Sequence, residues 1–121
     1  MRIVLICMLA LASTLAQAAP SEQYRIRTAA ELAGICGTPA SDADAATATA
    51  FCHGVLAGAY GYFVAATPAE DRFLCLPNPG PTRAQVAKGF VDWMKANPGR
   101  ANDGAIDALF RYGAETYPCK R

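Results

Sequence analysis

The stretch TAAELAGICGTPASDADAATATAFCHGVLAGAYGYFVAA, residues 28–66, decides the fold of this chain. It opens with Thr28 and Glu31, which have the spacing of a capping box, where each side chain binds a free backbone amide at a helix start. We expect this first helix to end by residues 37–39, Gly-Thr-Pro. A longer helix is predicted over residues 45–66, because apolar side chains recur there at helical spacing. The positions expected on its buried face are Phe51, Val55, Leu56, Ala59, Tyr62 and Phe63.

Two further helices are predicted after a proline-rich break. Residues 76–81, Leu-Pro-Asn-Pro-Gly-Pro, cannot form a helix, because each proline removes a backbone donor and restricts the residue before it. Thr82 and Gln85 then cap a third helix that we expect to end at residues 97–99, Asn-Pro-Gly. A fourth helix is predicted from near Ala101 to Thr116. No segment alternates like a strand, so the sequence predicts an all-α fold, a small bundle of about four helices.

The first residues have the pattern of an export signal. Arg2 supplies a positive start, residues 3–15 are almost continuously apolar, and Ala16-Gln17-Ala18 is a small-x-small site that a signal peptidase accepts. The apolar run is shorter than the roughly 20 residues that a bilayer span needs. We therefore predict a signal peptide over residues 1–18, cleaved near Ala18, and a single exported domain over residues 19–121 that has no membrane contact after cleavage.

Export makes the cysteines informative, because an oxidising compartment pairs them. Cleavage would remove Cys7 and leave Cys36, Cys52, Cys75 and Cys119, so we expect two disulfides. The short connection between the first two helices favours Cys36–Cys52, which leaves Cys75–Cys119. The pairing of Cys36 with Cys75 and of Cys52 with Cys119 stays open as the alternative. No Cys-x-x-Cys element occurs, so neither a zinc site nor a redox-active pair is expected.

Charge and motif content argue against several classes of function. The chain has 11 Lys and Arg against 10 Asp and Glu and no basic run, so no nucleic-acid partner is expected. The one histidine, His53, adjoins Cys52 on a helix, where neighbouring side chains point apart. No nucleophile elbow, phosphate loop or metal-binding histidine pair is present in the sequence. We therefore expect no enzyme activity, no catalytic residue, no metal and no cofactor.

Gly54, Gly58 and Gly61 form a strip along the second predicted helix. Glycine inside a helix costs about 0.5–1 kcal/mol relative to alanine, so the strip needs a reason. Close approach of another helix backbone within the fold is the expected reason, and a contact surface for a partner protein is the alternative. Among the aromatic residues, Tyr60 is the least consistent with the buried face, which makes it a candidate partner contact.

Several short motifs follow one another in a specific order. They are Phe51-Cys52-His53-Gly54 with Gly58, then Cys75-Leu76-Pro77, Asn97-Pro98 and Tyr117-Pro118-Cys119. Their order and spacing resemble the Rap/Tai family of type VI secretion immunity proteins, from Leu32 to Cys119. The resemblance implies a small helical periplasmic protein, with its disulfides at the four cysteines, that binds and blocks a peptidoglycan-cleaving amidase effector. Val55 departs from the aromatic residue that the family usually has after the first helix glycine.

The function expected from this resemblance is that of an immunity protein, an exported periplasmic inhibitor that occludes the active site of a peptidoglycan amidase effector. Loops on a rigid scaffold tend to carry binding, so Pro79 in the proline loop and Asn97 in the 97–102 turn join Tyr60 as predicted partner contacts. A second copy of the chain, in a homodimer, is the other partner considered. The alternative function is a periplasmic chaperone that responds to acid or stress and has no effector partner.

Overall fold

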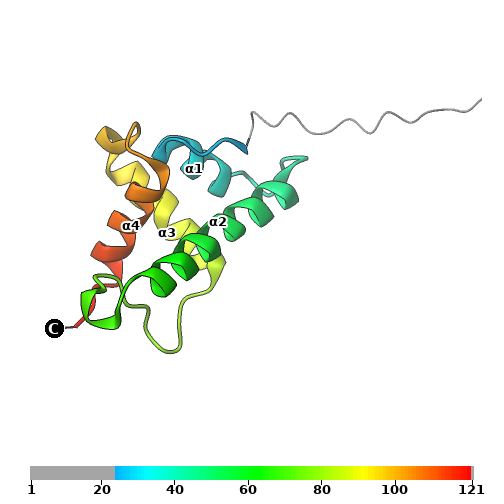
Figure 1. Cartoon of the computed structure of the whole chain (residues 1–121). Coiled ribbons are helices and arrows are strands. Elements are labelled where there is room, and N and C mark those ends of the chain that lie inside the picture. Colours follow the sequence, from blue (N-terminus) through cyan, green and yellow to red (C-terminus); the bar gives the residue numbers. More distant parts are fainter. Residues whose placement is uncertain (1–23, 121) are drawn as a thin grey trace, which may run out of the picture.

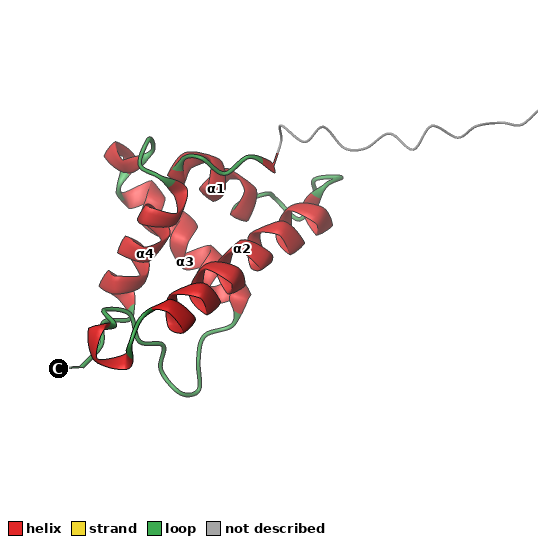
Figure 2. Cartoon of the chain, in the orientation of Figure 1, coloured by secondary structure: helices red, strands yellow, loops and turns green. Residues whose placement is uncertain are grey.

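The computed structural model describes residues 24–120, where four α-helices and two short 3-10 helices are joined by loops (Figure 1). In chain order they are α1 (Ala29–Cys36), α2 (Ala45–Ala66), η2 (Ala69–Asp71), α3 (Arg83–Ala96), η3 (Pro98–Arg100) and α4 (Ala105–Thr116). Figure 2 shows only helices and loops in this region, so the predicted all-α fold is confirmed. The predicted signal peptide, residues 1–18, lies outside the described residues.

Both predicted capping boxes are present and set the starts of α1 and α3. At α1, the Glu31 backbone amide donates to Thr28 Oγ1 at 3.2 Å, and the Thr28 amide donates to Glu31 Oε2 at 3.0 Å. At α3, the Gln85 amide donates to Thr82 Oγ1 at 3.1 Å, and the Thr82 amide donates to Gln85 Oε1 at 2.8 Å. Each box satisfies two of the amides that a helix start leaves free.

The core forms where α1, α2 and α3 meet. Phe90 of α3, Leu32 of α1 and Cys52 of α2 are the largest fully buried side chains. Full burial of a Leu or Phe side chain stabilises a fold by roughly 1.5–3 kcal/mol. α1 packs against the three other α-helices, and α4 adds Ala108 and Leu109 to the same core. Although α1 is the shortest α-helix, it contacts all of the others.

The fourth helix begins at Ala105, so the predicted start near Ala101 is wrong. Residues 101–103 instead accept hydrogen bonds from the first turn of α1. The Ala30 amide donates to the Ala101 carbonyl at 3.0 Å, and the Ala29 amide donates to the Asp103 carbonyl at 2.8 Å. A helix over these residues would use their carbonyls internally, which explains why α4 starts later.

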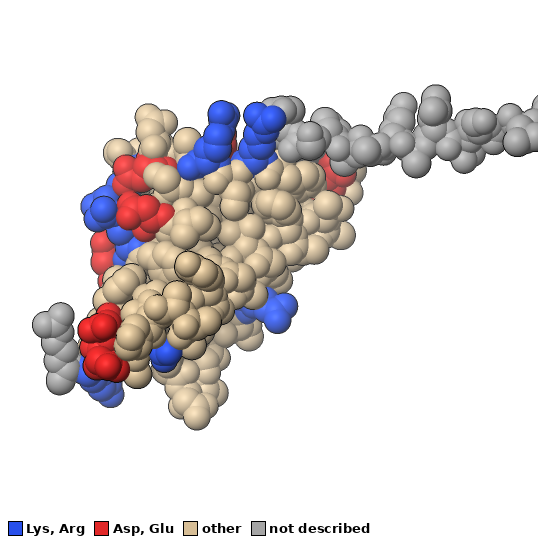
Figure 3. Space-filling view, viewed as in Figure 1, with Lys and Arg blue, Asp and Glu red and all other residues tan. Residues whose placement is uncertain are grey.

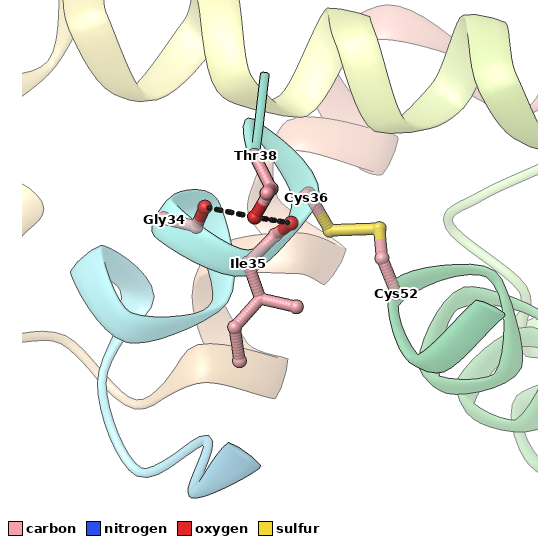
Figure 4. The surroundings of a disulfide bond; sticks show 5 residues. All are labelled: Gly34, Ile35, Cys36, Thr38 and Cys52. Atoms are coloured by element: carbon pink, nitrogen blue, oxygen red, sulfur yellow. Dashed lines mark hydrogen bonds between the residues drawn. A yellow bond between two sulfur atoms is a disulfide. The ribbon is translucent and has the colours of Figure 1, made fainter. Parts of the chain in front are cut away.

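Two disulfides join the bundle with the favoured pairing. Cys36 bonds Cys52 across a Cα–Cα distance of 5.2 Å, and Cys75 bonds Cys119 across 4.8 Å. Figure 4 shows the first bond between the end of α1 and α2, beside the Thr38 hydroxyl, which donates to the Ile35 carbonyl at 2.9 Å. The predicted pairing is confirmed, and the alternative pairing of Cys36 with Cys75 is excluded.

The closest packing around a glycine occurs at Gly89 of α3. A Cβ atom placed there would collide with the hydroxyl of Tyr112, which lies on α4. A Cβ atom placed at Gly58 of α2 meets no atom within 4 Å. Packing inside the bundle therefore requires a glycine at position 89 but not at position 58.

We predict that Gly89→Ala destabilises the protein by about 1–3 kcal/mol, because the added methyl overpacks the contact between α3 and α4. Gly58→Ala should stabilise it by about 0.5–1 kcal/mol, because alanine loses less backbone freedom in a helix. Urea unfolding followed by circular dichroism, with the disulfides intact, measures both changes. Equal stability of the two variants would contradict this account of the packing.

Candidate functional site

The exposed side of α2 consists of small residues. Its members are Ala50, Gly54, Ala57, Gly58, Gly61 and Ala65, all of them exposed, and we call them the small-residue face. They share one side of the helix because an α-helix repeats every 3.6 residues. No Asp, Glu, Lys or Arg occurs between residues 45 and 66, and Figure 3 shows a largely uncharged surface in this part of the molecule. The face is therefore smooth and neutral.

The expected reason for the glycine strip is wrong. Cβ atoms placed at Gly54, Gly58 and Gly61 meet no atom within 4 Å, so no helix backbone approaches them among residues 24–120. By length and composition α2 resembles a membrane-spanning helix. The side of α2 opposite the glycine strip, which includes Cys52 and Leu56, is however buried in the bundle. The strip has no role in internal packing.

Tyr62 lies at the edge of this face with 76% of its surface exposed, so its predicted place on the buried side of α2 is wrong. The buried positions of α2 are Ala48, Cys52, Leu56 and Phe63. They form one narrow line, because α2 packs against α1 and α3 but not closely against α4. An aromatic side chain held in solvent at the edge of a smooth face is well placed to contact a partner.

A pocket of about 280 Å³ lies next to the small-residue face, between α2 and α4. Its walls also include the proline loop and the start of α3. The lining residues that matter here are Leu56, Gly61, Leu74, Arg83, Leu109 and Tyr112. Because α2 and α4 do not pack closely along their lengths, space remains between them. Figure 1 shows α3 behind these two helices.

Two sets of contacts hold the walls of the pocket in place. At one end, the Phe63 ring lies 4.9 Å from the Phe73 ring and 5.3 Å from the Phe110 ring, measured between centroids. Along one wall, the Cys75 amide donates to the Tyr117 carbonyl at 2.9 Å, beside the second disulfide. Leu74 packs on Gly113, where an added Cβ would lie 3.0 Å from a Leu74 methyl. These contacts fix the segment that follows η2 against α4.

Arg83 is the one charged side chain that lines this pocket. No described carboxylate forms an ion pair with it, whereas Lys88, Arg100 and Arg111 each pair with an aspartate. It occupies the first position of α3, where the helix dipole favours a negative charge rather than a positive one. The sequence analysis did not single out Arg83. Its position directly after the capping residue Thr82 could have indicated it, because a positive charge is unusual at a helix start.

The three predicted partner contacts do not come together. Tyr60 is half-buried and lines the pocket, and Pro79 is exposed in the loop whose two ends, Leu76 and Pro81, also line it. Asn97 lies at the opposite end of α3, about 20 Å away for a helix of 14 residues. Its side-chain amide donates to the Trp93 carbonyl at 2.8 Å. Partner contact by these residues stays a prediction.

No cluster of metal-binding type is found among the described residues. Groups of three or more His, Cys, Asp or Glu side chains that could hold a metal ion are absent between residues 24 and 120. His53 is half-buried on α2. The four cysteines after residue 20 are all used in disulfides, so none of them offers a thiolate.

Tyr112 is the titratable group whose pKa the fold changes most clearly. It is buried, and this burial raises the pKa of its phenol to about 12, with a hydrogen bond involving Tyr117 as the next cause. Its ring forms part of the pocket wall and its hydroxyl lies against Gly89. Ionisation of Tyr112 would therefore place a charge between α3 and α4.

Comparison with known proteins gives one family. A family model described as Rap1a immunity proteins matches residues 28–119. The match covers the four α-helices and both disulfides. No curated protein and no solved structure matches the chain.

We predict that the protein loses stability as the pH rises from 10 to 12. The pKa of Tyr112 is higher in the folded state than the ordinary value near 10, so ionisation favours unfolding. The contribution is fully present below pH 10 and disappears as the pH passes through the folded-state pKa. Urea unfolding of the parent and of Tyr112→Phe at pH 9 and pH 11 tests this. An equal loss of stability in both proteins would contradict it.

Proposed function

This chain belongs to the Rap1a immunity proteins, and we propose from that premise that it blocks a secreted peptidoglycan amidase in the periplasm. Membership of the family implies an immunity protein that binds a cognate effector. The amidase as target and the periplasm as location are supported by the resemblance of the motifs to the Rap/Tai family. Two disulfides add support, because they persist in an oxidising compartment such as the periplasm.

The exposed glycine strip of α2 is the observation that carries the binding proposal. Each glycine costs about 0.5–1 kcal/mol relative to alanine in a helix interior. No described residue packs on the strip, so nothing inside the fold offsets that cost. A partner gains from the strip because glycine lets its backbone or a bulky side chain come close to the helix. We assign the small-residue face to the contact with the effector.

A stable interface must include residues beside the small-residue face as well as the face itself. Specific complexes bury at least about 1,000 Å² in total, which exceeds what one helix face supplies. Tyr62 borders the face and provides an exposed aromatic anchor. The proline loop, with Pro79 exposed, adjoins the nearby pocket and can extend the contact. Occlusion of the amidase cleft is then the mechanism, since a disulfide-bonded bundle that covers the cleft excludes the substrate.

A second copy of the chain is the competing occupant of the small-residue face. Homodimers pair the same patch on both subunits, and a smooth helix face without charge permits such pairing. We include the homodimer as the other proposed interaction, and the measurement below separates it from effector binding.

The chaperone alternative gains no support from the described residues. None of their charged side chains is buried, so protonation of carboxylates removes no buried charge.

We predict that Gly58→Leu weakens binding to the cognate amidase effector at least tenfold, because the added side chain prevents close approach. Tyr62→Ala should weaken binding by about 2 kcal/mol, the loss expected when an aromatic anchor of an interface is truncated. Calorimetry measures affinity, and peptidoglycan hydrolysis measures inhibition. Gly34→Leu is the matched control, since Gly34 is also an exposed helix glycine with no atom within 4 Å of an added Cβ.

The absence of any complex with that effector would reject the amidase as target. Light scattering of the chain alone reports its oligomeric state. If the parent is a dimer that Gly58→Leu converts to a monomer with unchanged effector affinity, the small-residue face belongs to the homodimer. If both leucine variants bind the effector like the parent, the face is not the effector contact.

A further inference from the structure

We propose that the pocket between α2 and α4 binds a small apolar carboxylate, of the size of an eight-carbon fatty acid. Its hydrocarbon chain would fill the pocket, and its carboxylate would pair with Arg83. The pocket shares Ala57 and Gly61 with the small-residue face, but octanoate binding requires no effector. Size, wall chemistry and charge are three separate observations that lead to this ligand class.

The size of the pocket limits the ligand to a small molecule. Its volume is about 280 Å³. An engineered protein cavity of about 150 Å³ binds benzene, and a liquid gives each water-sized unit about 30 Å³. By that measure the pocket holds roughly nine units of this size, which corresponds to the chain of octanoate. A phospholipid or a long-chain fatty acid would exceed it.

The walls favour hydrocarbon. Leu56, Leu74 and Leu109 come from three different segments and face the same space, and Tyr112 adds an aromatic ring. All four side chains are buried. Apolar lining with few polar groups is typical of pockets that bind small molecules. An apolar ligand would bury this surface and gain from leaving water.

The charge of the site favours an anion. Arg83 is the one charged residue of the lining, and no described carboxylate pairs with it. The start of α3 adds the positive end of a helix dipole at the same residue. Arginine binds carboxylates through two parallel hydrogen bonds, which a ligand head group at the pocket wall can accept. An uncharged ligand of the same length would lack this interaction.

Gly61 provides a clean way to close the pocket. It lies in the pocket wall, and a Cβ placed on it meets no atom within 4 Å, so Gly61→Leu fills space without displacing the bundle. Gly54 lies two turns earlier on the same helix, has the same free space around its Cβ, and does not line the pocket. Gly54→Leu is therefore the matched control for octanoate binding.

The experiment measures binding of sodium octanoate and of 1-octanol by calorimetry, with thermal unfolding to confirm that each variant folds. We expect the parent to bind octanoate at one site and more tightly than octanol. Gly61→Leu should weaken octanoate binding at least tenfold, whereas Gly54→Leu should change it less than twofold. Arg83→Gln should weaken octanoate binding about three- to tenfold and leave octanol unchanged. Arg83→Lys should have a smaller effect, because lysine keeps the charge but cannot make the two parallel hydrogen bonds.

Failure of the parent to bind octanoate at millimolar concentration would overturn the proposal. Equal weakening by Gly61→Leu and Gly54→Leu would place the binding outside the pocket and would also overturn it. Octanol that binds as tightly as octanoate, with no effect of Arg83→Gln, would reject the carboxylate. None of these results bears on the effector assay, where Gly58 and Tyr62 are the test positions, so the two proposals can fail separately.

Discussion

The backbone hydrogen bonds between the first turn of α1 and residues 101–103 fix α1 against the segment that precedes α4, and the position of Leu32 in the core depends on this connection. α1 has only 8 residues, and isolated helices below about 12–15 residues are marginal in water. Its amides at Ala29 and Ala30 find carbonyl partners in the segment before α4, and its far end is bonded to α2 through Cys36. Leu32 is thereby held in the centre of the core.

α2 packs against the rest of the bundle along one side only. α2 buries a narrow line of residues against α1 and α3 and exposes the rest. The exposed side carries glycine and alanine where a surface helix ordinarily carries charged residues. The same one-sided packing leaves space toward α4, which the Phe63, Phe73 and Phe110 rings close at one end. The small-residue face and the pocket therefore have the same cause, which is that α2 packs closely against α1 and α3 but not against α4.

The sequence predicted the local features and the disulfide pairing, but it missed other features that depend on residues far apart in the chain. The capping boxes at Thr28 and Thr82, the bounds of α2 and the proline break are local, and the structure confirms them. The start of α4 was misplaced because its cause is bonding to α1, about 75 positions earlier in the chain. Tyr62 was assigned to the core because helical periodicity gives a face but not its width. The pocket combines side chains from three helices and a loop, which no local pattern reveals.

The absence of charge along α2 has a kinetic consequence. A face without Asp, Glu, Lys or Arg contributes little electrostatic steering of its own, and association without steering has rate constants of about 10⁵–10⁶ M⁻¹ s⁻¹. Tight association through such a surface must then come from slow release. Salt screens only charges, so the strength of the contact would vary little with ionic strength.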